Sequence, residues 1–366
     1  MSEANKKIAM IFPGQGAQYL GMGKELYDTH RLIQEYFEEA SSCLESNFVR
    51  LCFASSEKEL RETINAQTAI FLISTSICML LKERYGITPD IVAGHSSGEY
   101  AAIFAAGGMS FPDALYLLKK RAQFMDEATK IYPGSMMAIL QISFEKLQEI
   151  CSRYDNPETL TDVAEIVNYN SSTQLVISGS LHALEQVSCD VKSLGGKAIT
   201  LNVAGAFHSR LMQDAEKQFG LYMVKVDFKD LSIPLINNVE AKIVMTNEEI
   251  KKSLQHQISS PVLWWPSMQQ LEGCDIIIEI GPNQLYSKML KREWPDKEII
   301  SINNLADIEN LLIKCGKSIA RTIHTESCHK DECAEEEIII IEDQSQLHDE
   351  PSVIESQHHN ESENLQ

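Results

Sequence analysis

Residues 89–102, PDIVAGHSSGEYAA, predict a strand, a sharp turn and the start of a helix in immediate succession. The apolar run Ile91–Ala93 predicts a buried strand, and the GHSSG that follows fits G-x-S-x-G, the pattern of a nucleophile elbow. Glycines on both sides of the turn let two backbone segments approach each other closely. This context favours an α/β fold with a parallel sheet, at whose C-terminal edge the Ser96 hydroxyl lies at a helix N-terminus. The alternative is an ordinary strand-to-helix turn with a helix-capping serine.

A glycine-rich loop after the first expected strand is a second candidate for the site. The strand Ile8–Phe12 is followed by PGQGAQ, residues 13–18. Such a loop lies at the C-terminal edge of a parallel sheet, where α/β proteins bind their ligands. The glycine spacing lacks both the dinucleotide fingerprint and the lysine of a phosphate loop, so we expect no nucleotide site there. The alternative is an ordinary glycine-rich turn.

The bulk composition indicates a soluble globular protein. The 366 residues suffice for a large domain and a small one, and 44% of them are hydrophobic. We expect no apolar run long enough to span a bilayer, and the short apolar segment at the N-terminus predicts a strand rather than a signal peptide. The nine cysteines have no framework spacing, which indicates reduced thiols. Together these features predict a cytoplasmic protein.

Negative charge is concentrated at the C-terminus. Residues 321–366 hold two basic and thirteen acidic residues, which is −11 of the net charge of −20 and leaves −9 for the rest. We expect a disordered acidic tail over 321–366, in which the run Ile338–Ile341 is either a partner-binding segment or a tolerated apolar stretch. Because no basic stripe is present, nucleic-acid binding is not expected. Cys328, His329 and Cys333 match no standard zinc spacing, so we expect no metal.

Periodicity predicts two subdomains before that tail. Residues 134–201 show the order β-α-β-β-α-β of a ferredoxin-like unit, inserted into an α/β-hydrolase-like large subdomain formed by 1–133 and 202–320. In the large subdomain, helices are expected over 26–43, 57–63 and 65–81, the last buried on all sides and ended by Gly86. Ser110 or Pro112 should lie near the N-cap of the next helix. A strand at 299–302 and a helix at 308–321 should close the fold.

Two further residues are candidates for chemistry. His208 follows a strand and a loop, and a serine nucleophile needs a base that comes later in the chain, as in the α/β-hydrolase order. A lone histidine is more often an ordinary surface or core residue. Arg121 is either a solvated charge or a clamp that binds a carboxylate with two parallel hydrogen bonds. Sequence spacing does not decide between the two.

Five motifs in order carry a resemblance to a known family. They are FPGQG at 12–16, GHSSGE at 94–99, the helix that contains Arg121, GAFHS at 205–209, and Gln257 through Trp264. Over about residues 7–315 the chain resembles malonyl-CoA:acyl-carrier-protein transacylases and the acyltransferases of polyketide synthases. The resemblance implies a Ser-His dyad with Ser96 as nucleophile and His208 as general base.

The same resemblance implies the remaining roles. A backbone carbonyl at Gln257 orients the histidine, and the backbone N–H groups of Gln15 and Ser97 form the oxyanion hole. Arg121 binds the malonyl carboxylate, and Phe207 fills the space that an α-methyl group would need. Further pocket positions are Gln67, Met125 and Asn170. The chain departs from the usual pattern at Gly205, where many synthase domains have histidine, which weakens the specificity assignment and leaves the chemistry unchanged.

The function implied is transfer of a malonyl group from malonyl-CoA to the phosphopantetheine thiol of an acyl carrier protein, through acyl-Ser96 and without a cofactor. We expect a monomer that acts in trans in fatty acid or polyketide synthesis, and the acidic tail favours the polyketide pathway. One alternative is an acyl hydrolase that clears carrier proteins, although such relatives tend to lose the clamp arginine. Another is a non-catalytic carrier-binding protein, against which the intact Ser96, His208 and Gln15 argue.

Overall fold

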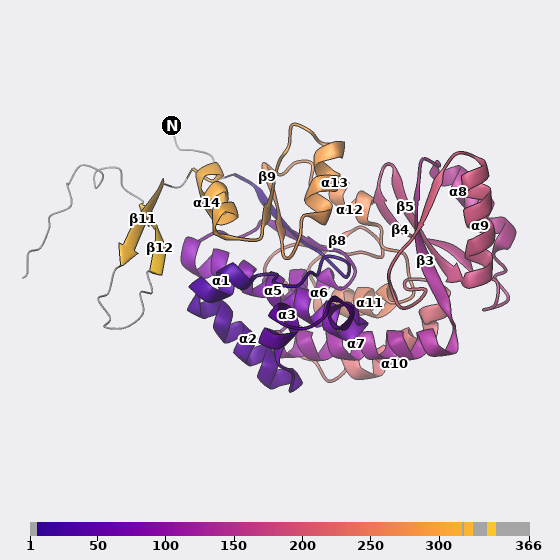
Figure 1. The fold of residues 1–366 in the computed structure, drawn as a ribbon, viewed down its shortest axis with the longest axis horizontal. Coiled ribbons are helices and arrows are strands. Elements are labelled where there is room, and N and C mark those ends of the chain that lie inside the picture. The colour runs from indigo at the N-terminus through magenta and orange to yellow at the C-terminus, as the bar shows by residue number, and fades with distance from the viewer. Residues whose placement is uncertain (1–5, 317, 325–334, 342–366) are drawn as a thin grey trace, which may run out of the picture. The chain divides into compact units, whose positions relative to one another are not determined.

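Six strands form the central sheet in the order β10–β9–β1–β2–β7–β8, in a computed structural model that describes residues 6–316 and, for the backbone alone, 318–324 and 335–341 (Figure 1). The strands are β1 (Ile8–Phe12), β2 (Ile91–Gly94), β7 (Leu235–Ile236), β8 (Ile243–Val244), β9 (Ile276–Ile280) and β10 (Glu298–Ile302). All pair in parallel except β8, which runs antiparallel to β7 at one edge. The predicted α/β fold with a parallel sheet is confirmed.

The register of this sheet brings distant segments together. Phe12 at the end of β1 pairs with Gly94 at the end of β2, so the loop 13–18 and the turn after β2 leave the same edge side by side. On the other side of β2, Ala93 pairs with Ile236 of β7, which places Asn237 and Asn238 beside the same turn. Three chain segments far apart in sequence therefore meet at one point.

The helices of this part of the chain surround the sheet. They are α1 (Lys24–Thr29), α2 (Arg31–Leu44), α3 (Phe48–Phe53), α4 (Glu57–Arg61), α5 (Thr63–Tyr85), α6 (Gly98–Ala105), α7 (Phe111–Ile131), α10 (Gln213–Met223), α11 (Asn247–Gln257), α12 (Trp264–Gln269), α13 (Leu285–Glu293) and α14 (Leu305–Lys314), with a 3-10 turn at Arg210–Met212. The single helix expected over 26–43 is wrong, because His30 adopts an extended conformation (φ −129°, ψ 113°) and separates α1 from α2. The side-chain periodicity continues across this break, which is why the pattern did not show it.

The long helix α5 is buried as predicted and ends at Gly86, whose φ of 60° suits glycine. By length and composition alone α5 could span a membrane, contrary to the expectation that no such run exists. Its most apolar window is 83% buried inside the protein, which is the environment of a core helix. On the next long helix, the Ser110 side chain accepts a hydrogen bond from the amide of Asp113, so Ser110 is the N-cap of α7.

A second sheet has four antiparallel strands in the order β4–β5–β3–β6. Its elements are β3 (Gly134–Leu140), α8 (Phe144–Tyr154), β4 (Ala164–Ser171), β5 (Gln174–Ser180), α9 (Leu181–Ser193) and β6 (Lys197–Thr200). Helices α8 and α9 pack on one face around Leu147, Ile177 and Leu184 (Figure 1). This is the predicted ferredoxin-like order, while the residue limits given to the two subdomains stay a prediction.

The C-terminal part differs from expectation. The chain divides into compact units at residues 1–311 and 312–366, and α14 ends at Lys314, seven residues before the predicted end of the closing helix. Ser318–His324 (β11) and Glu335–Ile341 (β12) pair as an antiparallel sheet, so the expectation of a tail without regular structure is corrected for these segments. Isoleucine in both segments, and threonine in the first, favour extended backbone. The other tail residues, with Cys328, His329 and Cys333, lie outside the described residues.

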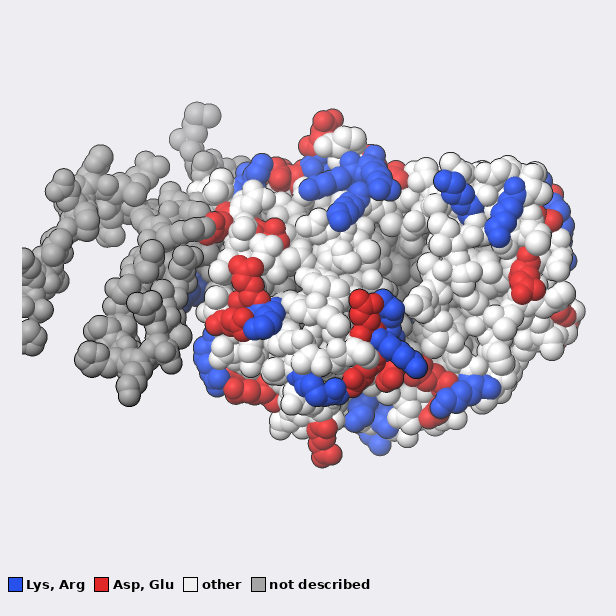
Figure 2. All heavy atoms as spheres, viewed as in Figure 1, with Lys and Arg blue, Asp and Glu red and all other residues white. Residues whose placement is uncertain are grey.

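Charged side chains of both signs lie next to one another on the face shown in Figure 2, with wide uncharged areas between them. Exposed ion pairs such as Lys24–Asp28 are screened by solvent and contribute little to stability. Among the described residues, the fully buried Lys, Arg, Asp and Glu side chains are Glu99, Arg121 and Glu279. Glu279 accepts hydrogen bonds from the backbone amides of Tyr286 and Ser287 at the start of α13, which is a structural role. The other two lie at the edge of the sheet where the three segments meet.

Candidate active site

The turn between β2 and α6 is a strained elbow. Ser96 has a φ of 52°, a conformation that non-glycine residues adopt rarely and that is common at functional sites. A Cβ atom on Gly94 would lie 2.1 Å from the carbonyl oxygen of Gly98, and one on Gly98 would lie 2.3 Å from that of Phe12. The two glycines of the motif are therefore required by close backbone approach. The elbow leaves Ser96 partly exposed while its neighbours are buried.

Asn238, two residues after the end of β7, holds the elbow in place. Its Oδ1 accepts a hydrogen bond from the Ser96 amide at 2.7 Å, and its Nδ2 donates to the Gly94 carbonyl at 2.6 Å. The side chain is completely buried, so neither bond competes with water. Sequence reasoning assigned no role to Asn238. The sequence feature that could have indicated such a role is a polar residue directly after a buried strand. This feature is weak evidence unless the order of the strands in the sheet is known.

Ser96 and His208 are in direct contact. The Ser96 hydroxyl oxygen lies 2.8 Å from His208 Nε2, and His208 Nδ1 lies 2.8 Å from the backbone carbonyl oxygen of Gln257. Because that carbonyl can only accept, Nδ1 carries the proton and Nε2 has its lone pair directed at the serine. Burial, together with the positive charge of Arg121, lowers the pKa of His208 to about 3, so the ring is neutral and can accept a proton at pH 7.

The loop after β1 lies against the elbow. A Cβ atom on Gly14 would lie 2.4 Å from the backbone oxygen of His95, so this loop can approach only with glycine there. The amides of Gln15 and Ser97 donate to no other residue in the described part of the chain. Two free N–H groups at the start of α6 and in the adjoining loop fit the requirements of an oxyanion hole.

Arg121 is a buried cation rather than a solvated one. Its exposure is 0%, its Nη1 donates to Gln67 Oε1 at 2.9 Å, and its Nη2 donates to the Ser96 hydroxyl at 2.9 Å. None of the ion pairs found within the described residues involves Arg121, and its Nε has no partner there. A buried guanidinium without a carboxylate partner is costly, and it fits an anionic group brought by a ligand.

Gln67 and Gln257 complete a hydrogen-bond network around Arg121. Gln67 Nε2 donates to Gln15 Oε1 at 3.3 Å, and Gln257 Oε1 accepts from Arg121 Nη2 at 3.0 Å. Gln257 therefore contributes its side chain to the arginine in addition to its carbonyl to His208. The side-chain contact was not foreseen, because the sequence pattern identifies only the position of the residue.

The other pocket positions lie outside this network. Met125 and Phe207 are buried, one on α7 a turn after Arg121 and the other directly before His208. Asn170 on β4 accepts a hydrogen bond through its Oδ1 from His95 Nε2 at 3.2 Å, and this ring is its link to the elbow. Burial lowers the pKa of His95 to about 4, which leaves this second histidine neutral. At Gly205, a Cβ atom would lie 2.1 Å from Thr129 Oγ1, so no side chain fits there without a shift.

The geometry supports nucleophilic acyl transfer. With an adjacent neutral histidine, two backbone N–H groups and a buried guanidinium, the Ser96 hydroxyl can take an acyl group that carries a carboxylate from one substrate and pass it to a second nucleophile. Within the described residues, no three His, Cys, Asp or Glu side chains gather in a way that could hold a metal ion.

Comparisons with known proteins agree with this chemistry. Residues 9–309 match the family described as acyl transferase domain. A malonyl CoA-acyl carrier protein transacylase of Bacillus subtilis (strain 168) is 40% identical over 307 residues, which are 83% of this chain and 95% of that protein.

Solved structures give the same result. The structure of the malonyl CoA-acyl carrier protein transacylase from Coxiella burnetii superimposes with a TM-score of 0.82 at 30% identity, covering 86% of this chain and 99% of that one. A type II polyketide synthase acyl carrier protein in complex with its malonyl transacylase gives a TM-score of 0.80 at 30% identity, covering 84% of this chain and 99% of that one.

Proposed function

The chain belongs to the acyl transferase domain family, and we propose that it transfers a malonyl group from malonyl-CoA to the phosphopantetheine thiol of an acyl carrier protein. The observation that carries the proposal is the buried, unpaired Arg121 whose Nη2 lies 2.9 Å from the Ser96 hydroxyl. An acyl group bound to Ser96 would place its free carboxylate within reach of this guanidinium. Malonyl is such a group, and acetyl is not.

In the first half-reaction the Ser96 hydroxyl attacks the thioester carbonyl, and its proton passes to His208 Nε2. The amides of Gln15 and Ser97 donate to the oxyanion, and removal of one such donor typically costs about 3 kcal/mol. Coenzyme A leaves with the proton from His208. In the second half-reaction the carrier thiol gives its proton to His208 and attacks the malonyl-Ser96 ester. The ester bond breaks, His208 returns the proton to the Ser96 oxygen, and the cycle is ping-pong.

Several features of the cellular context belong to this proposal. Coenzyme A thioester and holo-carrier protein are the two substrates, and the enzyme acts as a cytoplasmic monomer. Phe207 excludes an α-methyl group from the pocket, while Met125 and Asn170 shape it. The malonyl-carrier product supplies carbon units for fatty acid or polyketide synthesis, and the solved complex with a polyketide carrier supports the latter use among relatives.

An acyl hydrolase with the same dyad is the second candidate, because water can also attack an acyl-serine. The test is incubation with malonyl-CoA and a holo-carrier protein, followed by mass measurement of the carrier and assay of free malonate. Malonyl-carrier formation faster than malonate release supports transfer. Malonate release without carrier acylation would support the hydrolase instead. No turnover of either kind would support a non-catalytic carrier-binding protein.

A further inference from the structure

Glu99 is a buried carboxylate next to the proposed site that the mechanism above does not use. It lies in the first turn of α6, three residues after Ser96, and its exposure is 0%. Gln257 Nε2 donates to Glu99 Oε2 at 2.5 Å, and the Ser253 hydroxyl donates to Glu99 Oε1 at 3.4 Å. A carboxylate buried without a cation in direct contact is energetically costly, so its presence here needs an explanation.

The amide of Gln257 joins the two buried charges. Its oxygen faces the Arg121 guanidinium at 3.0 Å, and its nitrogen faces the Glu99 carboxylate. This orientation is the one in which both ends of the amide dipole are favourable, because the oxygen is directed at the cation and the N–H group at the anion. The backbone of the same residue orients His208. Glu99 therefore helps to fix a residue that contacts both the base and the clamp.

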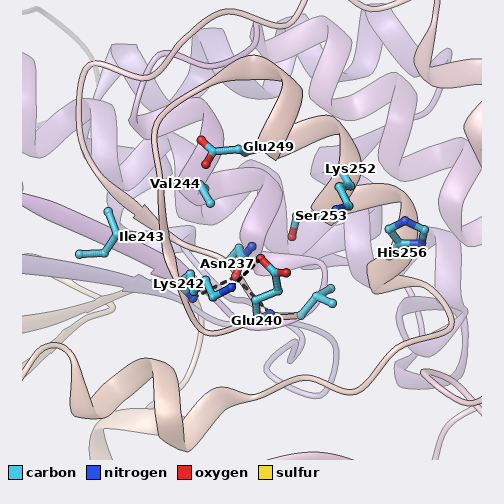
Figure 3. Close-up of a pocket in the computed structure, with 10 residues that line it drawn as sticks. Asn237, Glu240, Lys242, Ile243, Val244, Glu249, Lys252, Ser253 and His256 are labelled. Atoms are coloured by element: carbon cyan, nitrogen blue, oxygen red, sulfur yellow. Dashed lines mark hydrogen bonds and ion pairs between the residues drawn. The ribbon is translucent and has the colours of Figure 1, made fainter.

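Glu99 is linked to a cavity through Ser253. Ser253, its second hydrogen-bond partner, lines a cavity of about 320 Å³ between α11 and the β7–β8 turn. Figure 3 shows Ser253 on the same helix as Lys252 and His256, with Glu240 and Lys242 across the cavity. A cavity of this size can hold water. The Ser253 hydroxyl thus offers a one-step path for a proton between water and the buried carboxylate.

We propose that Glu99 is a positioning residue that balances the charge of Arg121 through Gln257 while the clamp is empty, and that binding of a malonyl carboxylate to Arg121 shifts Glu99 toward its protonated form, with the proton taken from solvent. The proposal rests on the proposed malonyl transfer. Two anions near one buried guanidinium repel each other, so binding of the substrate carboxylate favours the neutral form of Glu99. Glu99 in turn tunes how strongly the empty site attracts an anionic acyl group.

The surrounding charges are consistent with this exchange. Burial raises the pKa of Glu99 to about 7, against the opposing effect of hydrogen bonds from Gln257, Asn238 and Ser253 and of the Arg121 charge. Arg121 is the charged residue that acts on Glu99 directly. His208 is already neutral, and the charged and titratable residues that line the cavity are Glu240, Lys242, Glu249, Lys252 and His256. A substrate anion bound to Arg121 offsets the effect of its positive charge on Glu99. The pKa of Glu99 then rises further, so Glu99 takes up a proton near neutral pH.

The first test compares kcat/KM for loading of Ser96 by malonyl-CoA and by acetyl-CoA between pH 6 and 9. In the unaltered enzyme the ratio of kcat/KM for malonyl-CoA to that for acetyl-CoA should fall as pH rises through 7. The fall should be roughly tenfold if malonyl binding raises the pKa of Glu99 by one unit. Glu99→Gln keeps the shape and one of the two acceptor oxygens, and should flatten this dependence. Glu279→Gln removes a buried carboxylate in β9 that does not contact the clamp, and this variant should retain the pH dependence. Identical pH profiles for Glu99→Gln and the unaltered enzyme would overturn the proposal.

The second test needs no substitution at Glu99 and remains decisive if that variant does not fold. Calorimetric titration of Ser96→Ala with malonyl-CoA at pH 7.5, in two buffers with different ionisation enthalpies, should show uptake of a fraction of a proton. Acetyl-CoA should show none. His208, whose pKa is about 3, is too acidic to account for uptake at this pH. Malonyl-CoA binding without proton uptake contradicts the proposal, whereas failure of malonyl-CoA to load the unaltered Ser96 contradicts the proposed function itself.

Discussion

The ring of His208 is oriented by the backbone carbonyl of Gln257, 2.8 Å from Nδ1, in the position that an aspartate carboxylate takes in a Ser-His-Asp triad. A carbonyl fixes the same tautomer as a carboxylate but adds no full negative charge. The imidazolium that forms during catalysis is therefore stabilised less, and the neutral ring is favoured. The nearby positive charge of Arg121 acts in the same direction.

The pH dependence of loading should reveal this arrangement. Because His208 must be unprotonated to act as a base and its pKa is about 3, loading of acetyl-CoA should persist well below pH 6 as long as the protein stays folded. Arg121→Ala removes a positive charge that lowers this pKa, so the acidic limb of the profile should move to higher pH. Lys120→Ala, a neighbouring cation that lies over the Tyr222 ring, is the control and should leave the limb in place. If the acidic limb of the pH profile stays in place in Arg121→Ala, the guanidinium does not act on His208.

Arg121→Ala should also change the choice of acyl group. Loss of charge-assisted hydrogen bonds to a buried carboxylate costs about 1.5–3 kcal/mol, so malonyl loading should fall by roughly 10- to 100-fold. Acetyl-CoA has no carboxylate, and its loading should change far less. The two rates are measured by following the acyl-enzyme with time. An equal loss for both substrates would mean that Arg121 supports the site as a whole and does not bind the carboxylate.

Phe207 tests the proposed limit on substrate size. Its ring is 4% exposed and directly precedes His208, so a smaller side chain should open space beside the acyl group. Phe207→Ser should raise methylmalonyl loading relative to malonyl loading, measured with both thioesters in competition. Phe124→Ser on α7 removes a ring of similar burial that packs on Tyr222, and should not alter this ratio. If the two variants give the same ratio as the unaltered enzyme, Phe207 does not set the limit.

The elbow makes a prediction about stability. Gly98→Ala should destabilise the fold by several kcal/mol or prevent folding, because the added Cβ would lie 2.3 Å from Phe12 O and 2.7 Å from Pro13 O. Gly273→Ala is the matched control, since nothing lies within 4 Å of the added atom there, and should change stability by less than about 1 kcal/mol. Urea unfolding measures both. Equal stability of the two variants would contradict the close approach of the elbow and the first strand.

Local patterns made the central features predictable from the sequence. The elbow, the loop with Gln15 and the ferredoxin-like unit each depend on residues close together in the chain. The order of five motifs, the elbow and the Gln15 loop among them, indicated the family. The contacts of Asn238, Glu99 and the Gln257 side chain were not predictable in this way, because each joins residues more than 100 positions apart or requires the strand order. The break at His30 and the strand that contains Arg321 were missed for another reason, since backbone conformation there does not follow the apolar spacing.

The most direct test of the account is the mass of the intact protein after brief incubation with malonyl-CoA, followed by peptide mapping. The mass should increase by one malonyl group located on Ser96, and this increase should be absent in Ser96→Ala. Addition of a holo-carrier protein should remove the malonyl group from the enzyme, and the group should be recovered on the carrier. An unmodified Ser96, or a malonyl group on a different residue, would contradict it.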